Sequence, residues 1–289
     1  MDTIERRAPT TSYKRFKLRR MCGALGAEIT GVDLAKPMDD ELRAELNSAF
    51  LEHLVLCFPK QSISNDQQIA FTKTFGEIQP HPLYRSAEME GYRDILVLEH
   101  KAGQFFNGRN DIWHTDMTFK EVPPKLGMLY CRAVDEGFGD TMFCNMYKAY
   151  DTLSEGLRAM LDPLKAVHSS ALLQRRNNAK SYNIPIKEIP PPVIHPVIRT
   201  HPETGRKALF VNSSFVTNFV DMTEDESKPL LDYLVNHATQ HERIYRHRWR
   251  VDDLVMWDQR ATMHYVVIDY DADMHRRMHR TTVAGDRPF

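Results

Sequence analysis

Short apolar segments typical of β-strands recur along most of this chain and limit the folds that it can adopt. They are expected at residues 25–34, 55–58, 95–98, 126–131, 141–144, 197–200, 207–211, 243–250, 254–257 and 278–283. Turn residues separate them, and residues 201–206 are typical of a hairpin loop. Many short strands with few helices favour a mixed, mainly β fold. In a jelly roll of this kind, two closing sheets place inward side chains around a cavity.

A few amphipathic helices are expected to flank this core, at about residues 40–52, 65–75, 154–161 and 223–235. Ser64 with Gln67, and Thr223 with Glu226, have the spacing of capping boxes at helix N-termini. The first two helices are expected to cover the outside of a sheet.

Three segments lack regular periodicity. Residues 1–20 are polar and basic, and predict a flexible N-terminal arm or an interface segment. Residues 101–111 are rich in glycine and amides, which suits a loop that gates a substrate. Residues 180–193 contain four prolines and predict a lid or a disordered excursion. No linker divides the rest, so residues 21–289 are expected to form a single domain.

The composition narrows the classes of partner. With 38 basic and 39 acidic residues, the net charge of -1 gives no general field for nucleic acid or an acidic membrane. The segment 243–250 alternates arginine with aromatic residues, but its charges are expected on both faces of a solvated strand. Four scattered cysteines, and no apolar signal segment, indicate reduced thiols in a cytoplasmic protein. A small-molecule partner fits best.

The segment 113–119 contains a histidine and a carboxylate that suit one metal ion. On an extended segment, His114 and Asp116 point to the same side while Thr115 points away. Such a pair alone is a weak signal, and it needs a third ligand. His264, far downstream, offers a second imidazole. Two imidazoles and one carboxylate on one side of a metal form the arrangement of non-haem Fe(II) oxygenases.

The chain resembles the taurine dioxygenase/TfdA family of Fe(II)- and 2-oxoglutarate-dependent dioxygenases from about residue 25 to residue 289. The resemblance rests on several motifs in family order, which are Trp113-His114-Thr115-Asp116, Gly139-Asp140-Thr141, Trp257-Asp258, His264 and Arg276-x-x-His279-Arg280.

This resemblance implies a double-stranded β-helix (jelly roll) core with flanking α-helices, and a dioxygenase catalytic domain over residues 21–289. It implies that His114, Asp116 and His264 bind Fe(2+), with 2-oxoglutarate as cosubstrate and O2 as oxidant. No catalytic side chain is expected beyond the metal ligands, because the metal and the cosubstrate supply the difficult chemistry. A homo-oligomer, dimer or tetramer, is also expected.

Strand alternation assigns the arginines near the C-terminus. Arg276 and Arg280 lie four residues apart and face one side of a strand, whereas Arg277 faces the other. By resemblance, Arg276 binds the far carboxylate of 2-oxoglutarate, which a guanidinium matches with two parallel hydrogen bonds. Thr141 is expected to add a hydroxyl donor.

The substrate is expected to be a small organic anion. Arg280 matches a family position that often binds the acid group of the substrate. His81, Tyr84, Asn110 and Phe215 resemble residues that line the taurine pocket, where His81 and Arg280 would hold the sulfonate and Tyr84 and Asn110 the amine end. The first choice is therefore a sulfonate such as taurine. Hydroxylation beside sulfur would release sulfite and an aldehyde, with succinate and CO2.

Other functions stay open at this point. Residues 108–119 and 237–258 look as much like the branch that cleaves aryloxyacetates, so aryloxyalkanoates (2,4-D-like) and alkyl sulfate esters are alternatives. Asp258 is a weaker candidate ligand, which is expected to brace the turn before His264. A metal-binding or ligand-sensing jelly roll without turnover and a zinc hydrolase represent different classes.

Overall fold

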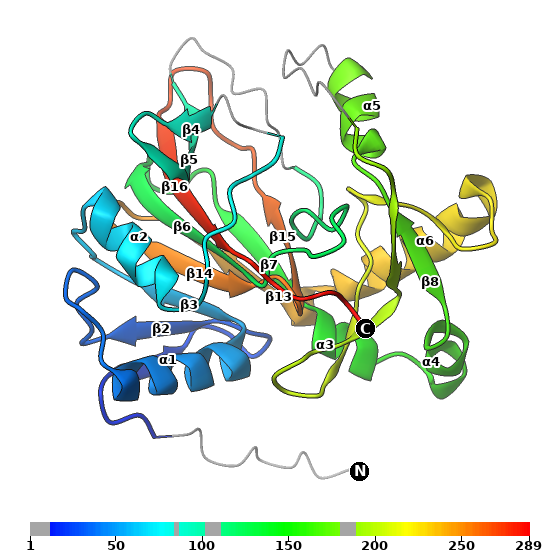
Figure 1. The fold of residues 1–289 in the computed structure, drawn as a ribbon, viewed down its shortest axis with the longest axis horizontal. Coiled ribbons are helices and arrows are strands. Elements are labelled where there is room, and N and C mark those ends of the chain that lie inside the picture. Colours follow the sequence, from blue (N-terminus) through cyan, green and yellow to red (C-terminus); the bar gives the residue numbers. More distant parts are fainter. Residues whose placement is uncertain (1–11, 84–86, 102–110, 180–188) are drawn as a thin grey trace.

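An eight-stranded sheet forms one side of the fold in this computed structural model, which describes residues 12–83, 87–101, 111–179 and 189–289 (Figure 1). Its strands, in spatial order, are β1 (Lys17–Arg20), β2 (Ala27–Thr30), β3 (Val55–Phe58), β14 (Leu254–Asp258), β6 (Leu126–Ala133), β16 (Arg276–Val283), β5 (Tyr92–His100) and β4 (Glu88–Met89). Neighbouring strands are antiparallel, except that β2 and β3 are parallel. Strands from both ends of the chain therefore share one sheet.

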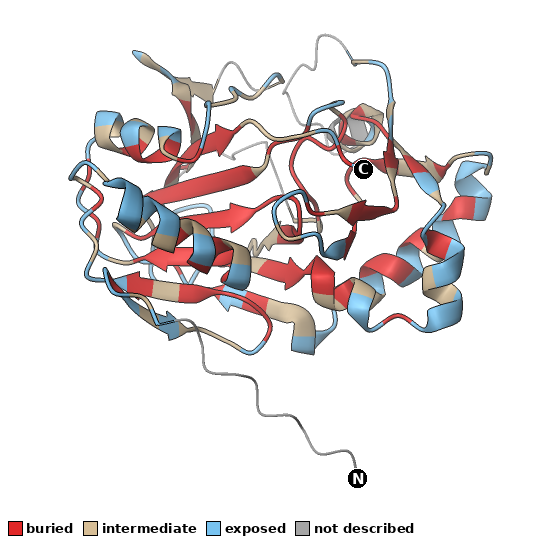
Figure 2. Ribbon diagram, turned by 60° about the horizontal axis from the view of Figure 1, so that its bottom comes forward, coloured by how far each residue is buried: buried red, intermediate tan, exposed pale blue. Residues whose placement is uncertain are grey.

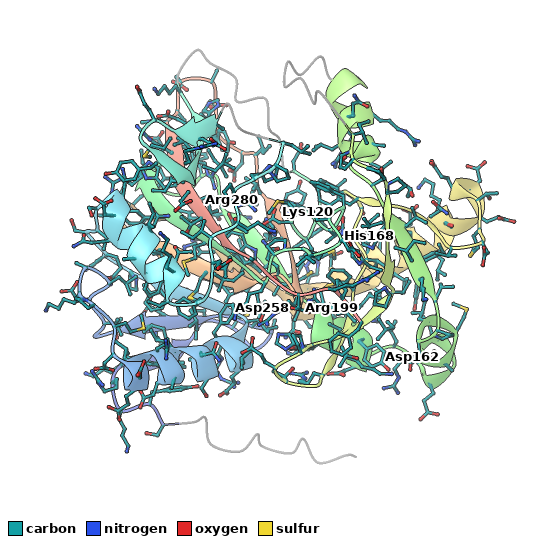
Figure 3. The ribbon with its side chains drawn as sticks, in the orientation of Figure 1. Lys120, Asp162, His168, Arg199, Asp258 and Arg280 are labelled. Atoms are coloured by element: carbon teal, nitrogen blue, oxygen red, sulfur yellow. The ribbon has the colours of Figure 1, made fainter. Side chains whose placement is uncertain are left out.

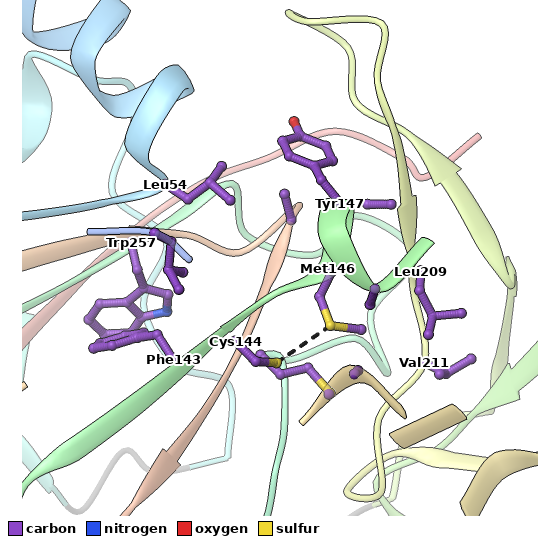
Figure 4. Close-up of a cluster of buried hydrophobic side chains, with 14 of the residues drawn as sticks. Leu54, Phe143, Cys144, Met146, Tyr147, Leu209, Val211 and Trp257 are labelled. Carbon is purple, nitrogen blue, oxygen red and sulfur yellow. Dashed lines mark hydrogen bonds between the residues drawn. The ribbon is translucent and has the colours of Figure 1, made fainter. Parts of the chain in front are cut away.

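A smaller sheet, in the order β13 (Ile244–His247), β7 (Thr141–Asn145) and β15 (Thr262–Val266), packs on the inner face of the large one. Phe143 of β7 contacts Trp257 of β14, with ring centroids 5.6 Å apart. Figure 4 shows both side chains in the buried cluster between the sheets, near Cys144. Two sheets that close on a common core form the jelly roll that the sequence predicts.

Alternate residues of β14 serve two different cores. Val255 and Trp257 face the smaller sheet, whereas Leu254 and Met256 face a second apolar cluster. That cluster includes buried side chains of α1 (Asp40–His53) and α2 (Asn65–Lys73), among them Phe50. Figure 2 shows buried strands beneath these helices and exposed outer helix faces. The expectation that the first two helices cover the large sheet is confirmed.

The remaining elements lie beside the smaller sheet, away from α1 and α2 (Figure 1). They are the sheet β12 (Val216–Phe219), β8 (Lys165–His168), β9 (Val193–Pro196), the hairpin β10 (Ile198–Thr200), β11 (Lys207–Leu209), the helices α3 (Met146–Asp151), α4 (Glu155–Leu161), α5 (Ala171–Ala179), α6 (Glu224–Ala238) and the 3-10 turn η2 (His241–Arg243). Helix α6 packs along β12 and α3.

Both predicted capping boxes are present. Ser64 caps α2 together with Gln67, and Thr223 caps α6 together with Glu226, each pair with both reciprocal hydrogen bonds. Helix α2 ends at Lys73, before the expected end at about residue 75. Within the described part of the chain, no helix is long and apolar enough to cross a membrane.

The structure corrects two sequence expectations. Residues 17–20, which were expected to belong to an arm over 1–20, form β1 and pair with β2, while residues 1–11 lie outside the described part. The strand expected over 243–250 ends at His247. Three of its arginines, Arg246, Arg248 and Arg250, are exposed while the side chains between them point inward, and Arg243 lies in the 3-10 turn before the strand. Burial of the inward-facing rings of His247 and Trp249 fixes the orientation of this segment.

Two expected loops fall largely outside the described residues. Residues 102–110 contain most of the expected gating segment, and residues 180–188 contain most of the proline-rich segment.

Candidate active site

A backbone bridge places two histidines side by side. The amide of His114 donates to the carbonyl of His264 at 3.0 Å, and the amide of His264 donates back at 2.7 Å. Their ring centroids are 4.1 Å apart. His264 lies on β15, where Trp257 packs against its ring at 5.0 Å. Sheet hydrogen bonding thus aligns both imidazoles before any ligand binds.

Asp116 completes a buried group of three possible metal ligands. One carboxylate oxygen lies 3.7 Å from His114 Nε2, and the other lies 3.8 Å from His264 Nε2. All three side chains are buried, and their ligand atoms lie within 4.8 Å of one another. Asp116 is not on an extended strand as expected, because a turn begins there and Met117 has a φ of 50°. The turn still directs the carboxylate towards His114.

The protonation states suit a cation. His114 Nδ1 lies 2.8 Å from the carbonyl of Ile112, so that nitrogen carries the proton and Nε2 presents a lone pair. Nε2 has no hydrogen-bond partner in the described structure. Burial lowers the pKa of His114 and, more strongly, that of His264, which keeps both rings neutral.

The carboxylate is held in its charged form. Burial opposes ionisation of Asp116, but the Arg280 guanidinium, the two histidines and a hydrogen bond from Gln259 together outweigh it, and the pKa of Asp116 lies well below its usual value. Two neutral imidazoles and one carboxylate, with a buried lone pair left unpaired, fit a divalent first-row metal. The residues present therefore match an Fe(II) site.

Gln259 supports Asp116 and was not identified from the sequence. Its side-chain oxygen accepts from the Asp116 amide at 3.1 Å, and its side-chain amide donates to Asp116 Oδ2. A side chain at Gly127 would collide with Gln259 and Trp257, so the glycine leaves room for both. The only sequence signal was its place immediately after Trp257-Asp258.

Asp258 does not join the three possible ligands. Its carboxylate accepts hydrogen bonds from the Arg260 guanidinium at 2.7 and 2.9 Å, and it lies 3.1 Å from His201 Nε2. These contacts fix the turn that leads into β15. The structure thus places Asp258 as the brace that the sequence indicated.

Arg276 and Thr141 are both buried polar residues. Arg276 Nε donates to the Gly139 carbonyl at 3.1 Å, and its Nη2 is buried without a hydrogen-bond partner in the described structure. Thr141 Oγ1 accepts from Trp249 Nε1 at 3.0 Å, so its own proton can be donated elsewhere. A buried guanidinium with an unpaired nitrogen needs a hydrogen-bond acceptor, and a carboxylate also matches its charge. These two side chains therefore fit a carboxylate of 2-oxoglutarate.

Arg280 lies next to the possible metal ligands. Its Nη2 forms an ion pair with Asp116 Oδ2 at 2.6 Å, and both side chains are buried. Burial first, and then the charge of Arg280, lower the pKa of His81 to about 3. The Lys120 ammonium also lowers it. Arg280 and Lys120 are both labelled in Figure 3.

An apolar wall begins one residue after Asp116. It contains Met117, Phe119, Leu173 and Phe215, with Leu83 packed against it. Phe119 and Phe215 rings are 5.1 Å apart. The structure therefore brings predicted Phe215 into the wall that starts beside the metal ligands. The other two predicted substrate residues, Tyr84 and Asn110, lie outside the described part of the chain.

Comparisons with known proteins agree with this geometry. Residues 16–282 match the family described as "Taurine catabolism dioxygenase TauD, TfdA family". An alkylsulfatase from Acinetobacter baylyi is 33% identical, with 94% of this chain and 86% of that protein covered. An alpha-ketoglutarate-dependent 2,4-dichlorophenoxyacetate dioxygenase from Cupriavidus pinatubonensis is also 33% identical, with 90% and 94% covered.

Solved structures show the same fold. A taurine dioxygenase from Burkholderia xenovorans superposes with a TM-score of 0.80 at 32% identity, with 95% of this chain and 91% of that chain covered. Enzymes of this family use Fe(II), 2-oxoglutarate and O2. The family match, which spans most of the chain, and the clustered ligands lead to one conclusion: this chain belongs to the TauD/TfdA family of Fe(II)- and 2-oxoglutarate-dependent dioxygenases.

Proposed function

We propose that this dioxygenase hydroxylates a small organic anion with Fe(II) held by His114, Asp116 and His264. The observation that supports this most is the convergence of three buried ligand atoms, with His114 Nε2 left unpaired. When bound, iron with 2-oxoglutarate and O2 supplies the oxidising power that replaces a C–H hydrogen by hydroxyl, while 2-oxoglutarate becomes succinate and CO2. The protein side chains position the reactants and exclude water.

Arg276 and Thr141 are proposed to hold the cosubstrate. The unpaired Arg276 Nη2 donates to the far carboxylate, and the Thr141 hydroxyl donates a further hydrogen bond. Trp249 orients that hydroxyl by donating to its oxygen. Gly139 has a φ of 65°, and a Cβ there would lie 2.7 Å from Arg276 Cδ, so the glycine lets the arginine reach its place.

The anionic group of the substrate is proposed to pair with Arg280. This guanidinium contacts Asp116, so a substrate anion that pairs with it would lie beside the metal. The neutral His81 ring can hydrogen-bond an oxyanion without adding charge. Lys120 is half-buried and adds positive charge to the same region. A sulfonate or sulfate group, with three terminal oxygens, uses several such donors at once.

The organic part of the substrate is proposed to lie on the apolar wall formed by Met117, Phe119, Leu173 and Phe215. This surface favours an alkyl chain on the sulfur group. Hydroxylation of the carbon next to a sulfonate gives a product that separates into an aldehyde and sulfite. The same step on an alkyl sulfate ester gives an aldehyde and sulfate. Taurine, the first choice from the sequence, remains a member of this class.

Cleavage of aryloxyalkanoates is the second candidate. The tilted rings of Phe119 and Phe215 suit contact with an aryl ring, and Arg280 can pair with a carboxylate as well as with a sulfonate. The relative from Cupriavidus pinatubonensis acts on 2,4-dichlorophenoxyacetate, whereas the Acinetobacter relative is an alkylsulfatase.

Product analysis separates these candidates. Iron-loaded protein would be supplied with 2-oxoglutarate, air and one of four substrates: taurine, an alkylsulfonate, an alkyl sulfate or 2,4-dichlorophenoxyacetate. The expected result is sulfite or sulfate in equal amount to succinate. Replacement Arg280→Leu should weaken binding of the productive substrate and leave the KM for 2-oxoglutarate nearly unchanged. Phenol release without sulfite or sulfate would refute the organosulfur assignment and leave the iron site intact.

The homo-oligomer and the cytoplasmic location stay predictions. Light scattering of the purified protein checks the first, and cell fractionation checks the second.

A further inference from the structure

A second group of metal-ligating side chains is buried outside the active site. It contains Cys57, His247 and Asp253, whose ligand atoms all lie within 4.8 Å of one another. The three side chains are only 2%, 2% and 4% exposed. None of them belongs to the iron, cosubstrate or substrate groups described above. A thiol, an imidazole and a carboxylate form a donor set typical of zinc-class cations.

The fold brings these residues together from both sheets. Cys57 lies on β3 and pairs with Val255 of β14 in the large sheet. His247 ends β13 and pairs with Thr141 in the smaller sheet. Asp253 precedes β14, where its carbonyl accepts from the Cys131 amide at 2.9 Å. A bound cation would therefore connect the two sheets across their common core.

The imidazole is oriented as a ligand would be. His247 Nδ1 lies 2.8 Å from the Tyr245 hydroxyl, which in turn donates to Met21 Sδ at 3.0 Å. With its proton on Nδ1, the ring presents the Nε2 lone pair to Asp253. Histidines that bind metals usually donate their other nitrogen to such an oxygen, which fixes the tautomer.

The spacing also suits one shared cation. His247 Nε2 is buried without a hydrogen-bond partner in the described structure, and it lies 3.5 Å from Asp253 Oδ2. Two ligands about 2.0–2.2 Å from a tetrahedral zinc ion are separated by roughly 3.4 Å. The Arg250 amide donates to the same carboxylate oxygen at 3.1 Å, which holds it in position.

We propose that Cys57, His247 and Asp253 form a second, structural metal site for a zinc-class divalent cation, separate from the catalytic iron. One thiolate and one carboxylate neutralise a divalent charge, so the complete site is neutral within the core. The cation would satisfy the unpaired His247 nitrogen and stabilise the contact between the sheets.

A nucleophilic Cys-His-Asp arrangement is the competing interpretation of the same residues. Burial raises the pKa of the Cys57 thiol well above its ordinary value, and the Asp253 carboxylate raises it further. A nucleophile needs the opposite shift and access for a substrate, whereas a bound cation itself deprotonates a coordinating thiol. Burial of all three side chains excludes that access, whereas a cation can be enclosed as the chain folds.

Cobalt provides a direct probe, because only a site with a thiolate ligand gives sulfur-to-cobalt charge-transfer absorption in the near ultraviolet. The full chain would be expressed in minimal medium with cobalt, and its metal content and spectrum measured. We expect a second equivalent of cobalt per chain and the thiolate absorption. His114→Ala should lose the catalytic equivalent but retain this absorption, which separates the proposal from that of the iron site.

Substitutions identify the ligands. Cys57→Ala and His247→Ala should each remove the absorption, while Cys144→Ala, a control at another buried thiol, should keep it. If a variant does not fold, the wild-type chain still decides the matter through its metal content and spectrum. Wild-type protein with one cobalt equivalent and no thiolate absorption, or absorption that persists in Cys57→Ala, would overturn the proposal.

Discussion

Gln259 holds Asp116, a proposed metal ligand, through two hydrogen bonds. His114, Asp116 and His264 could be selected from the sequence because their side chains are characteristic metal ligands in a recognisable order. Gln259 could not, since a glutamine carries no ligand signature. Its role depends on a contact with Asp116 across 143 residues of chain.

Gln259→Leu tests the importance of that contact. Loss of both hydrogen bonds frees the Asp116 carboxylate to rotate, so iron affinity or turnover should fall about 10- to 100-fold. Iron titration and succinate formation measure the effect. Gln240→Leu, at an exposed glutamine, is the matched control and should behave as wild type. Equal iron affinity and turnover in the two variants would show that Gln259 does not position the ligand.

Periodicity identified long elements better than short ones. The capping boxes of α2 and α6 and the apolar strands β3, β6 and β14 were recognisable because local sequence determines them. The short strands β4 and β9 were missed, since Glu88–Met89 and Val193–Pro196 show no apolar alternation. Their sheet neighbours, rather than their own residues, make them strands.

Strand β16 gives a prediction at the scale of an element. Arg276 is buried with an unpaired nitrogen, whereas Arg277 is partly exposed and lies 3.9 Å from Glu99. Loss of a hydrogen bond to a charged group costs about 1.5–3 kcal/mol. Arg276→Ala should therefore raise the KM for 2-oxoglutarate about 10- to 100-fold, and Arg277→Ala should hardly change it. Steady-state kinetics with varied 2-oxoglutarate measures both KM values. A larger increase in Arg277→Ala than in Arg276→Ala would show that the strand register is assigned wrongly.

The sheet order could not be derived from local sequence. The large sheet places β14 between β3 and β6, and β16 between β6 and β5, and these four pairs join segments that are not consecutive along the chain. Local patterns indicate which side of a strand is buried, but not which strand lies beside it. The jelly roll was expected from the number of short strands and from resemblance, and the structure adds the order.

Buried histidines make stability depend on pH for the whole molecule. His168 is fully buried, and burial, followed by the neighbouring His195, lowers its pKa well below 6.5. As the pH decreases, His168 therefore binds a proton in the unfolded chain at a higher pH than in the folded chain. The contribution of the neutral histidine to the free energy of unfolding is fully present above about pH 6.5. It falls as the pH decreases, by at most about 1.4 kcal/mol per pH unit for each such histidine.

Urea denaturation between pH 7 and pH 5 measures this effect. The wild-type free energy of unfolding should decrease towards pH 5, and His168→Leu should show a smaller decrease over the same range. An identical pH slope in the two proteins would mean that His168 accepts a proton in the folded state.

The iron site itself is tested most directly by anaerobic Fe(II) titration of the wild type, His264→Ala and Asp258→Asn, followed by succinate measurement after air is admitted. Each of the three is also made with Cys57→Ala as a common background, so that only the catalytic centre binds metal. We expect His264→Ala to lose iron affinity at least about tenfold and to form no succinate, because one of three protein ligands is gone. Asp258→Asn should retain tight iron binding. Near-normal iron affinity and succinate formation in His264→Ala would contradict the assignment of His114, Asp116 and His264 as the metal ligands.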